Sequence, residues 1–252
     1  MAAEIQKLEM SDGFLVYANP KAAMETQFIH KEIFQDKCYD VAPFPEDAFM
    51  IDAGGNIGMF SLYMKKKYPA ATILAFEPAP TTFNTFKKNM ELHNISGVQV
   101  YQCGLGRENS NETLTFYPNM PGNSTLHGGE KEEFIKTADS EHPVIKLLSE
   151  VEQVQVDVKR LSGFLNNLPD LKRIDLLKID VEGAELDIFR GLDNAHWDLI
   201  ENIVLEICDH NGALEEAEVL LREKGFETSK ELADWAPKEM PMYMMVAKRV
   251  HH

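Results

Sequence analysis

Residues 49–60 read FMIDAGGNIGMF and contain the strongest structural signal in the chain. The segment starts as an apolar strand, passes through a turn with Gly54, Gly55 and Gly58, and continues as the beginning of a helix. Glycines suit such a turn because a ligand that approaches the end of a strand touches backbone, and a Cβ atom would block it. The segment therefore predicts an α/β fold with a ligand site where this strand ends.

From this segment onward, short apolar runs alternate with helical patterns, which is typical of βα units that feed a mostly parallel sheet. The last apolar run follows Phe226 too closely for another crossover helix, so we expect it to be antiparallel. The predicted strands are residues 49–51, 72–76, 98–103, 174–179, 203–207 and 242–246. These patterns predict a doubly wound sheet, mostly parallel with an antiparallel last strand.

Two regions do not follow this alternation. Residues 1–48 hold aromatic and acidic side chains without a clean period, and we interpret them as an N-terminal helical cap or lid. Residues 106–150 are rich in Asn, Gly, Ser and Glu, which is typical of a functional loop or a mobile insertion. We therefore predict a ligand-binding domain over residues 49–252, with an insertion at about 106–150, and substrate contacts from both irregular regions.

The net charge of the chain limits the classes of partner that it is expected to bind. The chain of 252 residues has 25 Lys and Arg against 41 Asp and Glu, so its formal net charge is −16. Such a field repels phosphate backbones and anionic headgroups, which argues against nucleic acid and membrane surfaces as partners.

The cysteines and the N-terminus predict a cytoplasmic location. Cys38, Cys103 and Cys208 are too few and too scattered for a disulfide framework or a metal-ligand spacing. The first ten residues carry acids where a signal peptide needs a basic region and an apolar run. No apolar stretch approaches the ~20 residues that a membrane-spanning helix needs.

Two acids indicate the kind of cofactor. Asp52 ends the first strand and is placed to meet a ligand amine, while Glu77 ends the next strand, where a carboxylate accepts the hydroxyls of a ribose. A dinucleotide fingerprint would need Gly-x-Gly-x-x-Gly, and Asn56 and Met59 stand where its later glycines belong. Asp52 alone is compatible with a helix cap, and the glycines alone with a tight turn. The ordered set favours S-adenosylmethionine over a nicotinamide cofactor.

The chain resembles the FkbM family of S-adenosylmethionine-dependent methyltransferases over about residues 28–210. The resemblance is carried by Glu32-Ile33-Phe34 with Tyr39, by residues 52–58 and 76–78, and by KIDVEGAE at residues 178–185. Ala53-Gly54-Gly55 departs conservatively from the Val-Gly-Ala that the family often has. The resemblance implies a Rossmann-like class I fold and methylation of a hydroxyl oxygen.

Within the family, the chain looks most similar to methyltransferase domains of polyketide and nonribosomal peptide pathways. The similarity is carried by residues 32–34, by Phe116-Tyr117-Pro118 and by Gly122-Asn123-Ser124. It implies a small-molecule or carrier-tethered acceptor and a possible place in a larger synthase.

Three residues are candidates for taking the proton of the acceptor hydroxyl. Asp180 directly follows a predicted strand, and Glu206 interrupts an otherwise buried one, where its charge needs a partner. That partner is either Lys178, in a structural ion pair, or a divalent cation such as Mg²⁺ held with Asp180 and Asp209. We favour catalysis without a required metal. His210, at the exit of the strand, is a candidate base because its ordinary pKa lies near neutrality.

Other candidates are structural as readily as functional. Cys103 and Gly104 end the third strand and would form a wall for the adenine ring. Glu185 is expected to satisfy a helix N-terminus. The methionine cluster at residues 240–245, with Trp235, either lines a pocket for an apolar substrate or packs in the core. The predicted cofactor contacts are Asp52, Gly54, Asn56, Gly58, Glu77, Cys103, Gly104 and Asp180.

The sequence therefore predicts an O-methyltransferase that uses S-adenosylmethionine. Two other classes of protein remain as alternatives. One is a nicotinamide-dependent oxidoreductase, and the other is a non-catalytic interaction domain that retains the fold.

Overall fold

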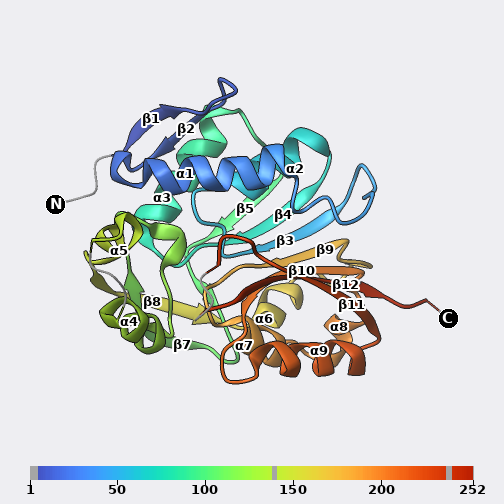
Figure 1. The fold of residues 1–252 in the computed structure, drawn as a ribbon. Coiled ribbons are helices and arrows are strands. Elements are labelled where there is room, and N and C mark those ends of the chain that lie inside the picture. The colour runs from blue at the N-terminus through green and yellow to red at the C-terminus, as the bar shows by residue number, and fades with distance from the viewer. Residues whose placement is uncertain (1–4, 138–140, 237–239, 252) are drawn as a thin grey trace.

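A twisted sheet of seven strands forms the centre of the computed structural model, which describes residues 5–137, 141–236 and 240–251 (Figure 1). Its strand order is β11-β12-β10-β9-β3-β4-β5. The strands are β3 (Phe49–Ala53), β4 (Thr72–Phe76), β5 (Val98–Tyr101), β9 (Leu176–Ile179), β10 (Asn202–Cys208), β11 (Phe226–Leu232) and β12 (Met242–Arg249).

The strand order creates a switch point between β3 and β9. From β3 the chain builds outward through β4 to β5, and it later returns to the other side of β3 with β9 and β10. These five strands are parallel, whereas β12 runs antiparallel to both β10 and β11. The predicted α/β, mostly parallel sheet with an antiparallel last strand is confirmed. Ligands of such sheets bind at the carboxyl ends of the strands beside the switch point.

Helices cover both faces of the sheet (Figure 1). They are α1 (Ala23–His30), α2 (Met59–Lys67), α3 (Pro80–Leu92), α4 (Gly128–Thr137), α5 (Pro143–Leu148), α6 (Leu161–Leu165), α7 (Glu185–Arg190), α8 (Asn194–Trp197) and α9 (Ala213–Glu223). Short 3₁₀ turns η1 (Pro20–Ala22) and η3 (Pro121–Asn123) and a π-helical turn η2 (Lys31–Gln35) complete the set. In the part of the chain that the structure describes, no helix has the length and apolar character needed to cross a bilayer.

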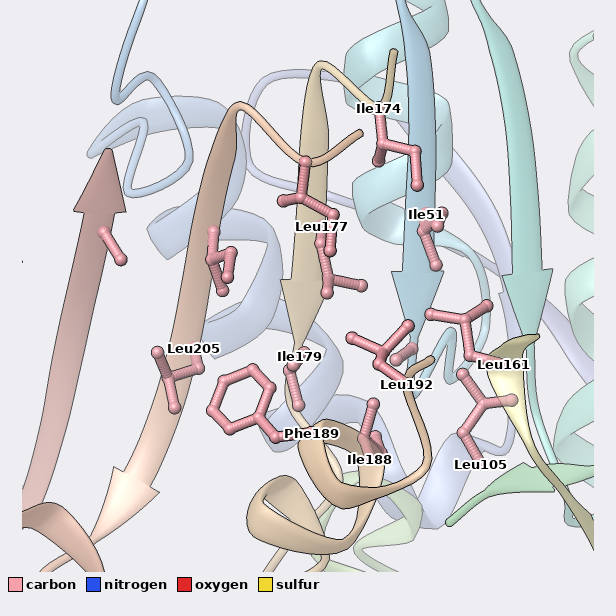
Figure 2. Close-up of a cluster of buried hydrophobic side chains, with 14 of the residues drawn as sticks. Ile51, Leu105, Leu161, Ile174, Leu177, Ile179, Ile188, Phe189, Leu192 and Leu205 are labelled. Carbon is pink, nitrogen blue, oxygen red and sulfur yellow. The ribbon is translucent and has the colours of Figure 1, made fainter. Parts of the chain in front are cut away.

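Each face of the sheet has its own hydrophobic core, because successive strand residues point to opposite sides. Ile51 of β3 and Leu177 of β9 pack with Ile188 and Phe189 of α7 on one face (Figure 2). Met50 of β3, the neighbour of Ile51, packs on the other face. Since both faces are covered, the central strands are mostly apolar, apart from charged residues such as Asp52 and Lys178, and this made them predictable from the sequence.

The N-terminal segment is a hairpin followed by a helix. Strands β1 (Gln6–Glu9) and β2 (Leu15–Ala18) pair antiparallel before α1 and η2. The predicted cap is thus helical only in its second half, because four-residue strands give too short an alternation to detect. Met10 and Val16 are buried in the same core as Met50. The domain boundary after residue 48 stays a prediction.

The region 106–150 is not a long loop. It contains β7 (Ser110–Phe116), η3, α4 and α5, and β7 pairs antiparallel with β8 (Glu152–Lys159). A short strand, β6 (Gly104–Leu105), pairs parallel with β8, which gives a second sheet in the order β6-β8-β7. The first four residues of β7 are all polar and alternate between half-buried and exposed, and its last three residues are buried. The strand therefore has no long apolar run that would have predicted it.

Candidate active site

A cavity of about 750 Å³ opens at the switch point of the sheet. Its lining includes Gly54 after β3, Glu77 after β4, Asp180 after β9 and Glu206 in β10. Helix α1 and turn η2 form one wall, and the region 106–150 forms another. The carboxyl ends of four parallel strands thus meet in one enclosed space.

The glycine turn brings backbone to the surface of this cavity. Gly54 has a φ of +79°, and a Cβ atom there would lie 1.7 Å from the carbonyl oxygen of Asp180. A Cβ atom on Gly55 would lie 2.7 Å from the ring of Phe86. Gly58 has a φ of +91° and starts α2 without lining the cavity, so its role is to shape the turn.

Asn56, which lines the cavity, has an unsatisfied buried acceptor. Its φ is +47°, a left-handed conformation that Asn tolerates better than most residues. Its backbone amide donates to Oε2 of Glu77 at 2.9 Å. Its side-chain Oδ1 is buried and has no hydrogen-bond partner. Because a buried unpaired acceptor is costly, this atom suits a ligand that brings a donor.

Glu77 is held from both sides of its carboxylate. Oε1 accepts the amide of Ala79 at 2.9 Å, and Oε2 accepts the amide of Asn56. Burial raises the pKa of Glu77 to about 8, although the two amides oppose this shift. Each carboxylate oxygen retains a free lone pair, so the fixed group can accept two hydroxyl donors.

Lys178 and Asp52 form a buried ion pair beneath the glycine turn. The Nζ of Lys178 lies 3.1 Å from Oδ1 of Asp52, whose side chain is fully buried and also accepts from Ser61 at 2.9 Å. Lys178 also donates to the carbonyl of Gly54 at 2.6 Å. Burial alone would lower the pKa of Lys178, but Asp52 and Asp180 raise it.

This pair tests two predictions. Asp52 does not line the cavity, so the expected contact with a ligand amine is wrong; its carboxylate fixes the turn through Lys178. Lys178, one of the two candidate partners of Glu206, does not form an ion pair with it. Lys178 instead contacts Asp52 and, at 3.7 Å, Asp180.

Asp180 and Glu206 are two further acids that line the cavity. The side chain of Asp180 is 34% exposed, and both residues line the cavity. Burial raises the pKa of each group, and the charge of Asp180 further raises that of Glu206. Two carboxyl groups in one apolar space cannot both ionise easily, so the pair is suited to holding or accepting a proton.

A sequence profile described as the Methyltransferase FkbM domain matches residues 52–228 of this chain. The chain belongs to the FkbM methyltransferase family. It is 62% identical over 247 residues to Methyltransferase 1 of Beauveria bassiana (strain ARSEF 2860), covering 98% of this chain and 99% of that protein. It is 34% identical over 240 residues to the 31-O-demethyl-FK506 methyltransferase FkbM of Streptomyces tacrolimicus, covering 90% of each chain.

A solved structure shares the fold of this FkbM-family chain. The structure of M. jannaschii TYW2 in complex with AdoMet aligns with a TM-score of 0.52, over 98% of this chain and 87% of that chain. The two sequences are 10% identical, so the likeness concerns the fold alone. The predicted class I methyltransferase fold is confirmed.

The segments that carry the FkbM resemblance all reach the cavity. Glu32 and Tyr39 line it from the N-terminal side, and residues 54–56, 76–78 and 180–182 line it from the strand ends. Glu185, at the end of the last segment, instead accepts the amide of Gly183 at 2.9 Å outside the lining. Its structural interpretation agrees with this position.

Two predicted residues lie away from the FkbM-family cavity. Strand β10 ends at Cys208, and Asp209 and His210 follow in an exposed turn outside the lining. His210 is therefore not placed to act as the base on an acceptor in the cavity. The structure also does not bring Asp180, Glu206 and Asp209 together. Within residues 5–137, 141–236 and 240–251, no group of three His, Cys, Asp or Glu side chains is arranged to hold a metal ion.

The adenine wall and the methionine cluster are each divided between core and cavity. Gly104 lines the cavity, whereas Cys103 packs in the hydrophobic core, so its predicted cofactor contact is wrong. Met242 and Met244 of β12 line the cavity, and Met245 is fully buried in the core. The alternation of the strand thus divides these methionines between the cavity and the core, and a role in binding an apolar substrate stays a prediction.

Helix α1 supplies cavity-lining side chains that the sequence analysis missed. Glu25, Phe28 and Ile29 of α1 and the already named Glu32 of η2 fall at i, i+3, i+4 and i+7, and all four line the cavity. This helical spacing was the available signal, and it was hidden because residues 1–48 were considered as one segment. The carboxylate of Glu25 accepts from the Gly122 amide at 3.2 Å and the Asn123 side chain at 3.0 Å.

Lys131 fastens the region 106–150 to the strand ends. Its Nζ donates to the carbonyl of Asn123 at 3.0 Å and to Oε2 of Glu182 at 2.9 Å. The hydroxyl of Thr125 donates to the carbonyl of Glu182 at 2.6 Å. These bonds make the region a fixed wall of the cavity, and its predicted substrate contacts stay a prediction.

The buried carboxyl groups predict an unusual dependence of stability on pH. Burial raises the pKa of Glu25 and Glu185 to about 7 and that of Glu77 to about 8, from an ordinary 4.5. Between 4.5 and about 8 the unfolded chain loses these protons while the folded chain retains them, so the free energy of unfolding falls as pH rises. We expect a higher melting temperature at about pH 6 than at about pH 8.5, measured by circular dichroism.

The variant Glu25→Gln removes one of these titrating groups and should flatten the pH dependence. A melting temperature that rises over the same interval would contradict the assignment of these groups as buried acids.

Proposed function

We propose that this FkbM-family protein transfers the methyl group of S-adenosylmethionine to a hydroxyl oxygen. The observation that carries the proposal is one cavity in which Asn56 and Glu77 face the same space as Asp180 and Glu206. The first two are acceptors suited to a cofactor with amine and ribose donors. The second two are acids suited to taking a proton.

The residues present fit S-adenosylmethionine. Gly54 and Gly55 line the cavity with backbone, and Asn56 offers a buried Oδ1 that has no partner. Glu77 would hold the two ribose hydroxyls, and Gly104, the first residue of β6, would lie beside the flat base. Among the described residues of the lining, six carboxyl groups stand against two lysines, which favours a ligand of positive charge. When bound, the cofactor supplies an electrophilic methyl group on a sulfonium centre.

The chain's own contribution is positioning and proton removal. Lys178 and Asp52 fix the glycine turn, and α1 and the region 106–150 exclude water from the strand ends. Asp180, or Glu206 beside it, would accept the acceptor's proton as the oxygen is methylated. Positioning alone can lower a barrier by about 7 to 11 kcal/mol, and a general base adds about 10²- to 10⁴-fold.

The comparisons support a hydroxyl acceptor. The Streptomyces relative bears the name of a 31-O-demethyl-FK506 methyltransferase, which describes methylation at oxygen in that protein. By this analogy the acceptor is a small molecule of a biosynthetic pathway, either free or tethered to a carrier. The nicotinamide-dependent oxidoreductase is disfavoured for two reasons. The family is one of methyltransferases, and two of the three glycines of the dinucleotide fingerprint are missing from this sequence.

The ribose assignment predicts the effect of Glu77→Ala. The variant should weaken binding of both S-adenosylmethionine and S-adenosylhomocysteine by ~1 to 3 kcal/mol, the usual cost of a lost charge-assisted hydrogen bond. Calorimetric titration measures both affinities. Glu185→Gln is the matched control, because Glu185 is also buried and bonded to a backbone amide but lies outside the lining. Unchanged affinity in Glu77→Ala would contradict the assignment of Glu77 as the ribose contact.

A further inference from the structure

Large apolar side chains gather at one edge of the cavity. Met24 and Phe28 of α1 are 46% and 40% exposed, and Trp235 is 48% exposed. All three line the cavity, although they come from opposite ends of the chain. Single exposed apolar side chains are ordinary on a protein surface, but a group of them on one concave surface marks a ligand site.

This edge is held together by specific contacts. The rings of Phe28 and Trp235 meet edge to face, with centroids 5.7 Å apart and an angle of 88°. The indole Nε1 of Trp235 donates to Oε1 of Glu32 at 3.1 Å. Trp235 is thereby fixed against α1 with its apolar surface left open to the cavity.

Strand β12 extends the apolar surface to the carboxyl groups. Met242 and Met244 lie on the cavity side of β12, and Met244 is the antiparallel partner of Glu206 in the sheet. We call Phe28, Trp235, Met242 and Met244 the acceptor wall. The wall thus begins beside Glu206 and reaches the cavity edge at Trp235.

The charges beside the wall select against anions. Glu32, Asp180 and Glu206 line the cavity next to it. The two lysines in the described lining are already paired, Lys131 with Glu182 and Lys178 with Asp52 and Asp180. An acceptor carrying a carboxylate or phosphate would therefore lose its hydration beside these carboxyl groups, and neither lysine is free to pair with it.

We infer that the acceptor wall binds an uncharged alcohol with an apolar body, and that Trp235 and Phe28 determine this specificity. The hydroxyl of such an acceptor faces Asp180 and Glu206, while its apolar part lies along the aromatic and methionine side chains. Methionine is well suited to such a surface because its flexible, polarisable side chain adapts to different shapes. The inference rests on the proposed methyltransferase function and narrows its acceptor class.

The experiment uses two probes of matched shape, para-tert-butylbenzyl alcohol and para-tert-butylbenzoate, added to the protein saturated with S-adenosylhomocysteine. Trp235 reports binding through protection of its fluorescence from acrylamide, because the other tryptophan, Trp197, is only 3% exposed. We expect the alcohol to protect Trp235 and to bind at least about tenfold more tightly than the benzoate, as one unfavourable charge contact of ~1.4 kcal/mol requires.

Variants separate the wall from other apolar surface. Phe28→Ala should weaken alcohol binding by about tenfold or more, measured by calorimetry, with S-adenosylhomocysteine affinity unchanged. Trp235→Ala should do the same and also abolish the alcohol-dependent protection from acrylamide, since only the buried Trp197 remains. Val219→Ala is the matched control, because Val219 is 44% exposed on α9 outside the cavity lining. It should bind the alcohol as the parent chain does.

Failure of this inference is distinct from failure of the proposed function. Suppose that S-adenosylhomocysteine binds normally, but the benzoate binds as well as the alcohol or neither probe binds. The inference about the acceptor wall is then wrong, while the proposed methyltransferase function stands. Normal alcohol binding in both Phe28→Ala and Trp235→Ala overturns this inference too. If S-adenosylhomocysteine itself does not bind, the proposed function fails first.

Discussion

Asp180→Asn is expected to lower turnover by about 10²- to 10⁴-fold, the range in which general-base catalysis contributes. The affinity for S-adenosylmethionine should change little, because a group that takes the acceptor's proton acts in the transition state more than in binding. Asn keeps the shape of the side chain and an oxygen that can still accept from Lys178. The buried lysine also retains Asp52 as its partner, so the fold should persist.

Single-turnover rates and calorimetric affinities measure the two effects separately. Glu206→Gln is a useful second variant. Glu206 lines the same cavity as Asp180, and its strand, β10, is the neighbour of β9, which Asp180 follows. His210→Ala should be as active as the parent chain, since His210 is exposed and lies outside the cavity lining. Turnover at the parent rate in Asp180→Asn would remove Asp180 from the mechanism.

Activity after EDTA treatment, with and without added Mg²⁺, tests a metal requirement independently.

The sheet was predictable where burial on both faces leaves no choice of residue. Residues 73–76 are apolar and buried after the exposed Thr72, and residues 72–76 form β4 as predicted. Strand β11 escaped prediction because it lies at the edge of the sheet, with Phe226 buried and most of its other side chains in solvent. An edge strand is specified by its pairing with β12, which a single sequence does not display.

The site was predictable to the extent that strand ends converge. Glu77 and Asp180 follow parallel strands, so both were expected at one edge of the sheet, and both line the cavity. The partner of Lys178 was not predictable, because it depends on register. Lys178 stands beside Asp52 on one side and Val204 on the other, two residues before Glu206.

The buried pair of Lys178 and Asp52 predicts a large loss of stability in Lys178→Met. The substitution leaves the fully buried carboxylate of Asp52 without its cation, and breaking such a pair typically costs about 3 to 5 kcal/mol. Urea unfolding followed by circular dichroism measures the change. Lys65→Met is the matched control, because Lys65 is equally buried but donates to the carbonyls of Pro69 and Ala71 rather than to a carboxylate.

The double variant Asp52→Asn with Lys178→Met distinguishes charge from packing. If the lost stability comes from an unpaired buried charge, removing that charge should recover most of it. A double variant as unstable as the single one would place the effect in packing. Lys178 also donates to the Gly54 carbonyl, so the rescued double variant should still bind S-adenosylhomocysteine more weakly than the parent chain. Full affinity there would mean that the ion pair stabilises the fold without positioning the cofactor turn.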